Sequence, residues 1–284
     1  MLHALVGELV MKNTLFDLAD RVYVVTGATG ALAGSAADYL AGQGARVVYL
    51  GRSAEKVDAA LAKCRAQTAD AQCLGIVADV MQRDMLEQAR DTILQKWGRI
   101  DGLLNGAGGN MPGATIAPGK DFSDLDFESF QQVVDLNLHG TVLPSLVFGP
   151  VMVEGGRGSI INYSSVSAPV VVTRVVGYSA AKAGVENFTR WLAVDMARRT
   201  EGKVRVNAVL PGFFLGEQNR RLLTNEDGSL TERGQLVVNQ TPFGRFGQAD
   251  ELHGAIHYLL ADASKFVTGS ILPVDGGFVA FSGV

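Results

Sequence analysis

The chain has 284 residues, of which 47% are hydrophobic, and its formal net charge is −4. This length and composition suit one large α/β domain with an ample core. Acidic and basic residues are interleaved, so we expect no clustered basic face for nucleic acid. We also expect no apolar run long enough to span a bilayer. The first residues lack the basic start and cleavage site of a signal peptide, so residues 1–17 are predicted to be a lead-in to the first strand.

Cysteines and histidines argue against a metal or disulfide framework. Cys64 and Cys73 are the two cysteines of the chain, and their spacing resembles neither a metal site nor a redox motif. They are predicted to be reduced thiols of a cytoplasmic protein. His253 and His257 are four residues apart, but no Glu follows His253 and no third ligand is near in sequence. We therefore predict surface or interface histidines and no metal.

Short apolar runs rich in Val, Ile and Leu alternate with longer amphipathic stretches along the chain. Seven runs are predicted strands: Val22–Thr26, Ala45–Leu50, Cys73–Ala78, Gly102–Asn105, Ser159–Tyr163, Arg205–Leu210 and Ser270–Val274. Most are continuously apolar, which is typical of strands buried on both faces. Helices are expected between them, for instance over Leu32–Gln43, Met81–Trp97, Phe127–Val147, Val175–Arg198 and Ala249–Ala261.

This alternation of strand and helix predicts right-handed crossovers and a doubly wound parallel sheet. No internal repeat or flexible linker divides the chain. We therefore expect a single domain over residues 1–284.

A glycine-rich turn follows the first strand. Residues 26–34 read TGATGALAG and lead into a predicted helix. Glycines there let the backbone turn sharply and let a pyrophosphate approach the N–H groups of the helix N-terminus. The position between a first strand and a helix favours a dinucleotide site. The predicted cofactor contacts here are Gly27, Thr29, Gly30 and Leu32.

Three further strand ends carry cofactor signals. Arg52 stands where an acidic residue would hold the adenosine ribose, which favours the 2′-phosphate of NADP(H), with NAD(H) as the alternative. A solvated surface arginine is the competing interpretation. Asp79 and Val80 follow the third strand and suit a contact with adenine. Ligands of open parallel sheets bind at such carboxyl ends, so the signals converge. The other predicted contacts are Asn105, Ala107, Gly108, Pro211, Gly212 and Phe214.

The predicted catalytic residues begin with Tyr178 and Lys182, which lie four apart on one helix face. A free tyrosine has a pKa of about 10, and a neighbouring ammonium is expected to lower it toward the working range. Ser165 ends the fifth strand and is placed to hydrogen-bond a substrate oxygen. Asn137, inside the preceding long helix, is placed to hold a water that links the lysine to solvent.

Together these residues resemble the short-chain dehydrogenase/reductase family, from about residue 16 to the end. The matching motifs are TGATGALAG, Asp79, NGAG at 105–108, Asn137, Ser165, Tyr178 with Lys182, PG at 211–212 and VDGG at 274–277. The resemblance implies a Rossmann-type three-layer αβα sandwich with a mostly seven-stranded parallel sheet. It also implies a tyrosine acid/base, a stabilising serine, a lysine that binds the nicotinamide ribose, an asparagine-based proton relay and, commonly, a homotetramer.

The chain departs from the family pattern at two places. The usual turn is TGxxxGxG, but Ala31 and Ala33 replace its last two glycines, and a glycine stands at position 30. Gly216 occupies a place where the family often has a threonine that binds the nicotinamide carboxamide. Backbone groups of residues 213–215 are expected to substitute for it.

Several segments resemble the sugar-acid branch of the family, the D-mannonate oxidoreductases (fructuronate reductases). These segments are residues 108–112, 211–220, 225–233, 241–247 and 281–284, with departures from the branch at Met111 and Gly216. The implied reaction is D-fructuronate plus reduced cofactor giving D-mannonate, with Tyr178 donating the proton. A substrate loop is expected within residues 213–247.

Polar side chains near this loop suit a polyhydroxylated anion. Asn110, Gln218 and Asn219 offer partners for hydroxyl groups, while Arg220 or Arg174 could pair with a carboxylate. The loop could close over the substrate and exclude water, although a solvated surface loop is the alternative.

Three other functions compete with this one. The same machinery could reduce another polyol, sugar or keto substrate, or the chain could be a non-catalytic dinucleotide-binding protein. A nucleotide-sugar epimerase would usually need a larger C-terminal region.

Overall fold

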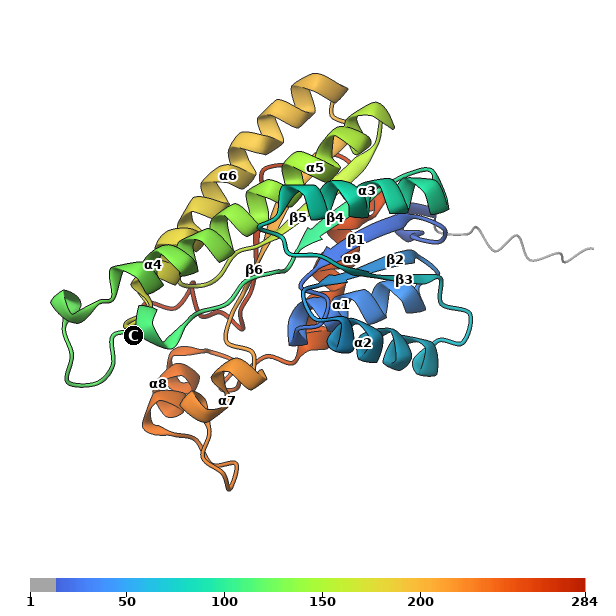
Figure 1. Cartoon of the computed structure of the whole chain (residues 1–284). Coiled ribbons are helices and arrows are strands. Elements are labelled where there is room, and N and C mark those ends of the chain that lie inside the picture. The colour runs from blue at the N-terminus through green and yellow to red at the C-terminus, as the bar shows by residue number, and fades with distance from the viewer. Residues whose placement is uncertain (1–13, 284) are drawn as a thin grey trace, which may run out of the picture.

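The computed structural model describes residues 14–283 (Figure 1). Most of the predicted N-terminal lead-in therefore lies outside the described residues, as does Val284. The described chain begins with a short 3-10 helix, η1 (Thr14–Phe16).

One parallel sheet organises the molecule. Its strands are β1 (Val22–Thr26), β2 (Arg46–Gly51), β3 (Cys73–Val77), β4 (Gly102–Asn105), β5 (Gly158–Tyr163), β6 (Val204–Pro211) and β7 (Ile271–Val274). Their order is β3-β2-β1-β4-β5-β6-β7, and every neighbouring pair is parallel. The seven predicted strands are confirmed. The strand order reverses between β1 and β4, so the ligand crevice is expected beyond their carboxyl ends.

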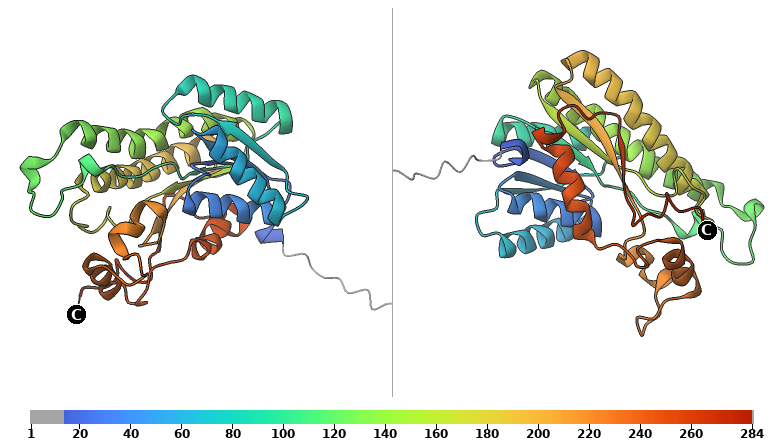
Figure 2. Two further views of the ribbon diagram at one scale, coloured as in Figure 1. Left: turned by 60° about the horizontal axis from the view of Figure 1, so that its bottom comes forward. Right: turned by 180° about the vertical axis from the view of Figure 1, so that it is seen from behind.

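Helices cover both faces of this sheet. The α-helices are α1 (Ala31–Gly42), α2 (Ala54–Gln67), α3 (Arg83–Trp97), α4 (Phe127–Val134), α5 (Gly140–Glu154), α6 (Val176–Thr200), α7 (Glu217–Leu223), α8 (Glu232–Gln240) and α9 (His253–Leu260). Shorter turns are η2 (Pro112–Ala114), η3 (Phe122–Asp124), the π-helical η4 (Asp135–His139), η5 (Ala249–Leu252) and η6 (Asp262–Ser264). Helices α1, α2 and α9 lie on one face, and α3, α5 and α6 on the other (Figures 1 and 2). The predicted three-layer Rossmann-type sandwich is confirmed.

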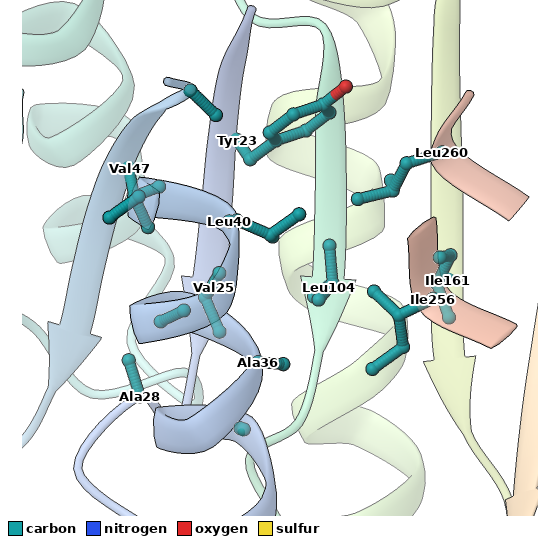
Figure 3. Packing of buried hydrophobic residues seen from close by; sticks show 14 of the residues in the cluster. Tyr23, Val25, Ala28, Ala36, Leu40, Val47, Leu104, Ile161, Ile256 and Leu260 are labelled. Carbon is teal, nitrogen blue, oxygen red and sulfur yellow. The ribbon is translucent and has the colours of Figure 1, made fainter. Parts of the chain in front are cut away.

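Alternation along β1 shows why the strands are continuously apolar. Val22 and Val24 belong to the core shared with α3, α5 and α6. Tyr23 and Val25 belong to the opposite core, shared with α1 and α9. Successive side chains of a strand point to opposite faces, and both faces here are covered. Figure 3 shows the second core with ten labelled residues: Tyr23, Val25, Ala28, Ala36, Leu40, Val47, Leu104, Ile161, Ile256 and Leu260.

The longest helical stretch differs from its prediction. It runs through residues 127–154 as α4, η4 and α5, continuing past the expected end at Val147 and including Pro144 and Pro150. Contrary to our expectation, this stretch is long and apolar enough to cross a bilayer. Half of its most apolar part is buried inside the domain, and α5 packs on β4 and β5. Its apolar character therefore belongs to a core helix.

The structure also gives partners to the cysteines and histidines. The Sγ atoms of Cys64 and Cys73 lie 3.2 Å apart as free thiols, a contact that their spacing did not predict. His253 bonds to the Ser35 hydroxyl, and His257 lies between the Tyr39 hydroxyl and the Phe16 carbonyl. Within residues 14–283 no group of three possible ligands could hold a metal ion.

Candidate active site

The glycine turn after β1 brings the backbone close to the loop after β4. Gly27 has a φ of +66°, and a Cβ there would lie 2.8 Å from backbone atoms of Ala107. Only glycine meets both demands without strain. A Cβ at Gly106 would lie 2.5 Å from the Cβ of Ala33. The glycine at 106 therefore makes room for the alanine that replaces a family glycine at 33.

Helix α1 presents an open N-terminus beside this turn. Gly30 is the N-cap, contributes no side-chain cap, and the first turn holds no acidic residue. The first N–H groups of a helix lack intrahelical partners and attract anions. This end of α1 is suited to a pyrophosphate group. Thr29 lies next to Gly51 at the end of β2, where a Cβ would meet its methyl group at 3.0 Å.

The adenosine end of the predicted cofactor site lies around β2 and β3. Arg52 directly follows β2 and is exposed. Asp79 is half-buried, and its Oδ1 accepts a hydrogen bond of 2.9 Å from the N–H of Met81. Val80 is buried, and a Cβ at Gly140 of α5 would lie 3.1 Å from its side chain. The side chain of Val80 therefore packs in the core, which leaves its backbone to face a ligand.

Asn105, another predicted cofactor contact, also uses its side chain inside the protein. Its buried Nδ2 donates hydrogen bonds of 2.9 Å to the Ser145 hydroxyl and of 2.9 Å to Oδ1 of Asn162. The side chain thus ties β4 to α5 and β5, while its buried Oδ1 has no hydrogen-bond partner among the described residues. Thr26 performs a comparable task nearby, because its hydroxyl accepts a 3.2 Å hydrogen bond from the N–H of Ala107.

Helix α6 carries the predicted catalytic pair. The Nζ atom of Lys182 lies 5.5 Å from the centroid of the Tyr178 ring and donates a 2.8 Å hydrogen bond to the carbonyl of Tyr163. Lys182 is buried, and this burial lowers its pKa to about 8. The role of the Tyr163 carbonyl had no sequence signal, because any residue supplies one.

The pKa of Tyr178 shifts in the direction opposite to the sequence expectation. Burial raises the pKa of the phenol, and a hydrogen bond with Ser165 only partly opposes this shift. The expected lowering of the pKa by Lys182 is therefore not found, because burial is the larger cause. A raised pKa keeps the phenol protonated near neutral pH. Tyr178 is therefore prepared to donate a proton to a substrate oxygen.

Ser165 is oriented by a residue that the sequence reasoning missed. The N–H and the hydroxyl of Ser167 donate to Oγ of Ser165 over 3.2 Å and 3.1 Å. This arrangement leaves the hydroxyl hydrogen of Ser165 free to point toward Tyr178 or a carbonyl oxygen. The run of three serines at 164, 165 and 167 was a signal, but periodicity alone did not show which of them support the others.

Asn137 lies in the π-helical turn η4, and such turns often occur at functional sites. Its Nδ2 donates a hydrogen bond of 2.6 Å to the carbonyl of Gly109 and one of 2.8 Å to the carbonyl of Val133. Its Oδ1 accepts a hydrogen bond of 3.1 Å from the N–H of Gly109. Both amide hydrogens are thus used. A Cβ at Gly108 would lie 2.7 Å from Asn137 Oδ1 and 3.5 Å from Lys182 Nζ. Asn137 therefore fixes the loop after β4 beside the lysine.

The predicted substrate residues are not brought together as closely as the predicted catalytic residues. Asn110 is exposed, and its amide donates to Thr115 over 2.9 Å. Asn219 accepts from the N–H of Gly216 at 2.8 Å and donates to the carbonyl of Phe214 at 2.8 Å. Both ends of the amide thus hold the start of helix α7, and the predicted substrate contact of Asn219 stays a prediction. Arg220 is exposed on α7, and the side chain of Gln218 lies outside the described residues.

A cavity lies where β6 meets the substrate segment. Its volume is about 210 Å³, and it is lined by residues 212–214, Thr241, Phe243, Arg245, Gly247, Glu251 and residues 274–276. Gly212 borders it and packs so tightly that a Cβ would lie 2.7 Å from Asp275. Neither Ser165 nor Tyr178 lines this cavity. Two predicted cofactor contacts, Gly212 and Phe214, do line it.

Sheet, glycine turn and the Ser165–Tyr178–Lys182 group define a class: an NAD(P)-dependent oxidoreductase acting on a carbonyl/alcohol pair. A family model described as "Enoyl-(Acyl carrier protein) reductase" matches residues 27–279. "Uncharacterized oxidoreductase UxuB" of Bacillus subtilis is 42% identical over 94% of this chain and 98% of its own length.

Two solved structures extend this comparison. A Haemophilus protein, whose activity as a D-mannonate oxidoreductase is itself a proposal, was solved with bound NAD; it shares 37% identity and a TM-score of 0.87, covering 94% of this chain and 98% of its own. A gluconate 5-dehydrogenase from Burkholderia cenocepacia, in complex with NADP and tartrate, shares 30% identity and a TM-score of 0.83 over 94% and 98%. The chain belongs to the short-chain dehydrogenase/reductase family.

Proposed function

We propose that this enzyme reduces D-fructuronate to D-mannonate. The ketone takes up a hydride on carbon and a proton on oxygen, while NAD(P)H becomes NAD(P)⁺. The observation that carries the proposal is the likeness, over 94% of this chain, to the Haemophilus protein proposed as a D-mannonate oxidoreductase. The polar substrate segment supports the same substrate class.

Residues of this chain fit the cofactor. The open N-terminus of α1 at Gly30 suits the pyrophosphate, and Gly108 leaves a space beside Lys182 that a Cβ would fill. When bound, NAD(P)H supplies the hydride. Arg52 is exposed at the end of β2, and it supports a preference for NADP(H) because an arginine pairs with a 2′-phosphate.

The chain's own residues perform the proton chemistry. Ser165 donates a hydrogen bond to the substrate oxygen, and the Tyr178 phenol transfers its proton to that oxygen as the alcohol forms. The phenol is protonated near neutral pH and can therefore serve as the acid in this direction of the reaction. Lys182 then supports return of a proton to the phenolate, and Asn137 holds the adjoining loop in place.

An oligomer is part of the proposal. Leu146 on α5 and Trp191 and Val194 on α6 expose 53%, 64% and 54% of their surface. Helices α5 and α6 lie side by side (Figure 1). Exposed apolar side chains on adjacent helices are typical of interaction surfaces, so a homotetramer assembled through these helices is expected. Sedimentation of wild type and of Trp191→Glu tests this.

The direct test is product identification. The enzyme is incubated with D-fructuronate and NADPH or NADH, and the product is identified by NMR. D-mannonate formed in proportion to the oxidised cofactor supports the proposal, and Tyr178→Phe serves as the matched control. A different or absent product from D-fructuronate, with other ketones reduced, would overturn the substrate assignment.

A second candidate is reduction of another keto acid of a polyol. The gluconate 5-dehydrogenase solved with NADP and tartrate favours it, because tartrate also combines hydroxyl and carboxylate groups. Assays with 5-keto-D-gluconate separate the two. A non-catalytic dinucleotide-binding role predicts no turnover with either substrate and no effect of Tyr178→Phe.

A further inference from the structure

Two arginines beside the substrate segment lack a carboxylate partner. Arg174 and Arg233 are both half-buried, and neither takes part in an ion pair with any side chain that the structure describes. The buried Arg205 also lacks an ion pair, but it bonds to Ser264 and the carbonyl of Ala261. Arg174 and Arg233 differ from it because their positive charges act on each other. Two half-buried guanidinium groups in this arrangement are suited to binding an anion.

Arg174 stands where the loops of the active site meet. It belongs to the loop between β5 and α6, which contains Ser165 and leads into the helix that carries Tyr178. Its carbonyl accepts a 3.0 Å hydrogen bond from the N–H of Ile116, in the segment after β4. Arg174 and Tyr178 are four positions apart in the chain, so their Cα atoms are at most about 14 Å apart. Arg174 therefore lies on the same side of the sheet edge as the phenol.

The backbone of Arg174 is held in an unfavourable conformation. Its φ is +78°, in the left-handed region that residues with a Cβ rarely adopt. Such conformations persist only where the surroundings impose them, and they gather at functional sites. The Ile116 hydrogen bond on one side and Arg233 on the other supply that constraint.

Arg233 reaches this loop from helix α8. Its Nη1 donates 2.8 Å to the hydroxyl of Thr173, and its Nη2 donates 3.3 Å to the carbonyl of the same residue. Two of its five N–H donors are thus used, and three are left. Burial and then the positive charge of Arg174 lower the pKa of Arg233. Its place in the first turn of α8 adds a further unfavourable interaction with the helix dipole.

We propose that Arg174 and Arg233 together bind the carboxylate of the substrate and so select a keto acid over a neutral ketose. The proposal rests on the proposed function and names the part of the site that recognises the acid. A carboxylate accepts paired hydrogen bonds from guanidinium groups and relieves the repulsion between two of them. Because Arg233 lies in the substrate segment, carboxylate binding also fixes α8 against the loop that carries Arg174.

The test compares Arg174→Gln and Arg233→Gln with Arg221→Gln, a control at an exposed arginine of α7. Each of the first two is expected to raise KM for D-fructuronate about 10- to 100-fold, the loss of a hydrogen-bonded charge pair. Reduction of D-fructose or another neutral ketone, however slow, should change less than about twofold. Calorimetric titration with D-mannonate should show the same loss of affinity. The control should behave as wild type.

Arg174→Gly separates binding from folding. Glycine accepts a φ of +78°, so the variant should unfold at the same or a higher temperature while KM for the acid rises. If wild type reduces neutral ketones but no keto acid, the proposed function itself falls. If wild type reduces D-fructuronate and the arginine variants keep its KM and its affinity for D-mannonate, only the arginine pair is overturned.

Discussion

The carboxyl end of the sheet and the substrate segment of residues 213–247 are held in different ways. Around β1, β4 and β5, polar side chains such as Thr26, Asn105 and Asn162 are buried and hydrogen-bonded to one another or to the backbone. The substrate segment instead carries the short helices α7 and α8, which lie outside the two helical layers (Figure 1), and exposes Leu236 and Phe243. From this difference we infer that a rigid core holds the groups that transfer the proton. Substrate choice depends on the segment of residues 213–247, which packs less tightly.

The largest effect is expected from removing the acid in the rigid region. Tyr178→Phe should lower kcat about 1,000-fold, because general acid catalysis contributes on that scale. Binding of NADPH, followed by fluorescence, and the unfolding temperature should remain unchanged. Retained turnover would show that another group donates the proton.

A pair of glycines tests the contrast in rigidity. Gly27 and Gly228 both have a positive φ, but a Cβ meets backbone at 2.8 Å only at Gly27 and meets nothing within 4 Å at Gly228. Gly27→Ala should cost about 2–4 kcal/mol of stability, and Gly228→Ala about 1 kcal/mol. The free energy of unfolding is measured by denaturant titration of both variants. An equal decrease in the two variants would contradict the proposed difference in rigidity between the two regions.

The pH dependence should report the buried lysine. Lys182 has a pKa of about 8, so it is charged below that pH and neutral above it. The kcat/KM for ketone reduction should therefore fall as pH rises through about 8, since only the charged ammonium stabilises the phenolate that forms when Tyr178 gives up its proton. The Lys182→Arg variant keeps the positive charge above pH 8, so any activity that this variant retains should not fall in that pH range. The same fall in that variant would assign it to another group.

The smallest effect concerns the cofactor. Arg52→Ala should lower kcat/KM for NADPH about 5- to 10-fold, since the residue is exposed, and should leave NADH nearly unchanged. Steady-state kinetics with both cofactors measure the ratio. An equal change for both would leave Arg52 as a solvated surface residue.

The same contrast explains what the sequence could predict. Strands buried on both faces have a strong apolar pattern, so all seven were found, and Tyr178, Lys182 and Ser165 were marked by fixed spacing. Hydrogen-bond direction leaves no such pattern. For that reason the sequence does not show that the Asn219 amide holds the start of α7, nor that Ser167 supports Ser165.

Long-range charge placement was equally hidden. Arg174 and Arg233 are far apart in sequence, and the 2.8 Å bond from Arg233 to Thr173 exists only once α8 folds against the β5–α6 loop. The burial that raises the pKa of Tyr178 also depends on the finished fold.

The most direct test of the account is the initial rate of cofactor oxidation by wild-type enzyme with D-fructuronate and with D-fructose. These ketoses differ chiefly in the carboxylate. The account predicts rapid oxidation of NADPH or NADH with D-fructuronate and little with D-fructose. Reduction of neutral ketones with no turnover of D-fructuronate would contradict it, leaving the family chemistry in place and the sugar-acid function refuted.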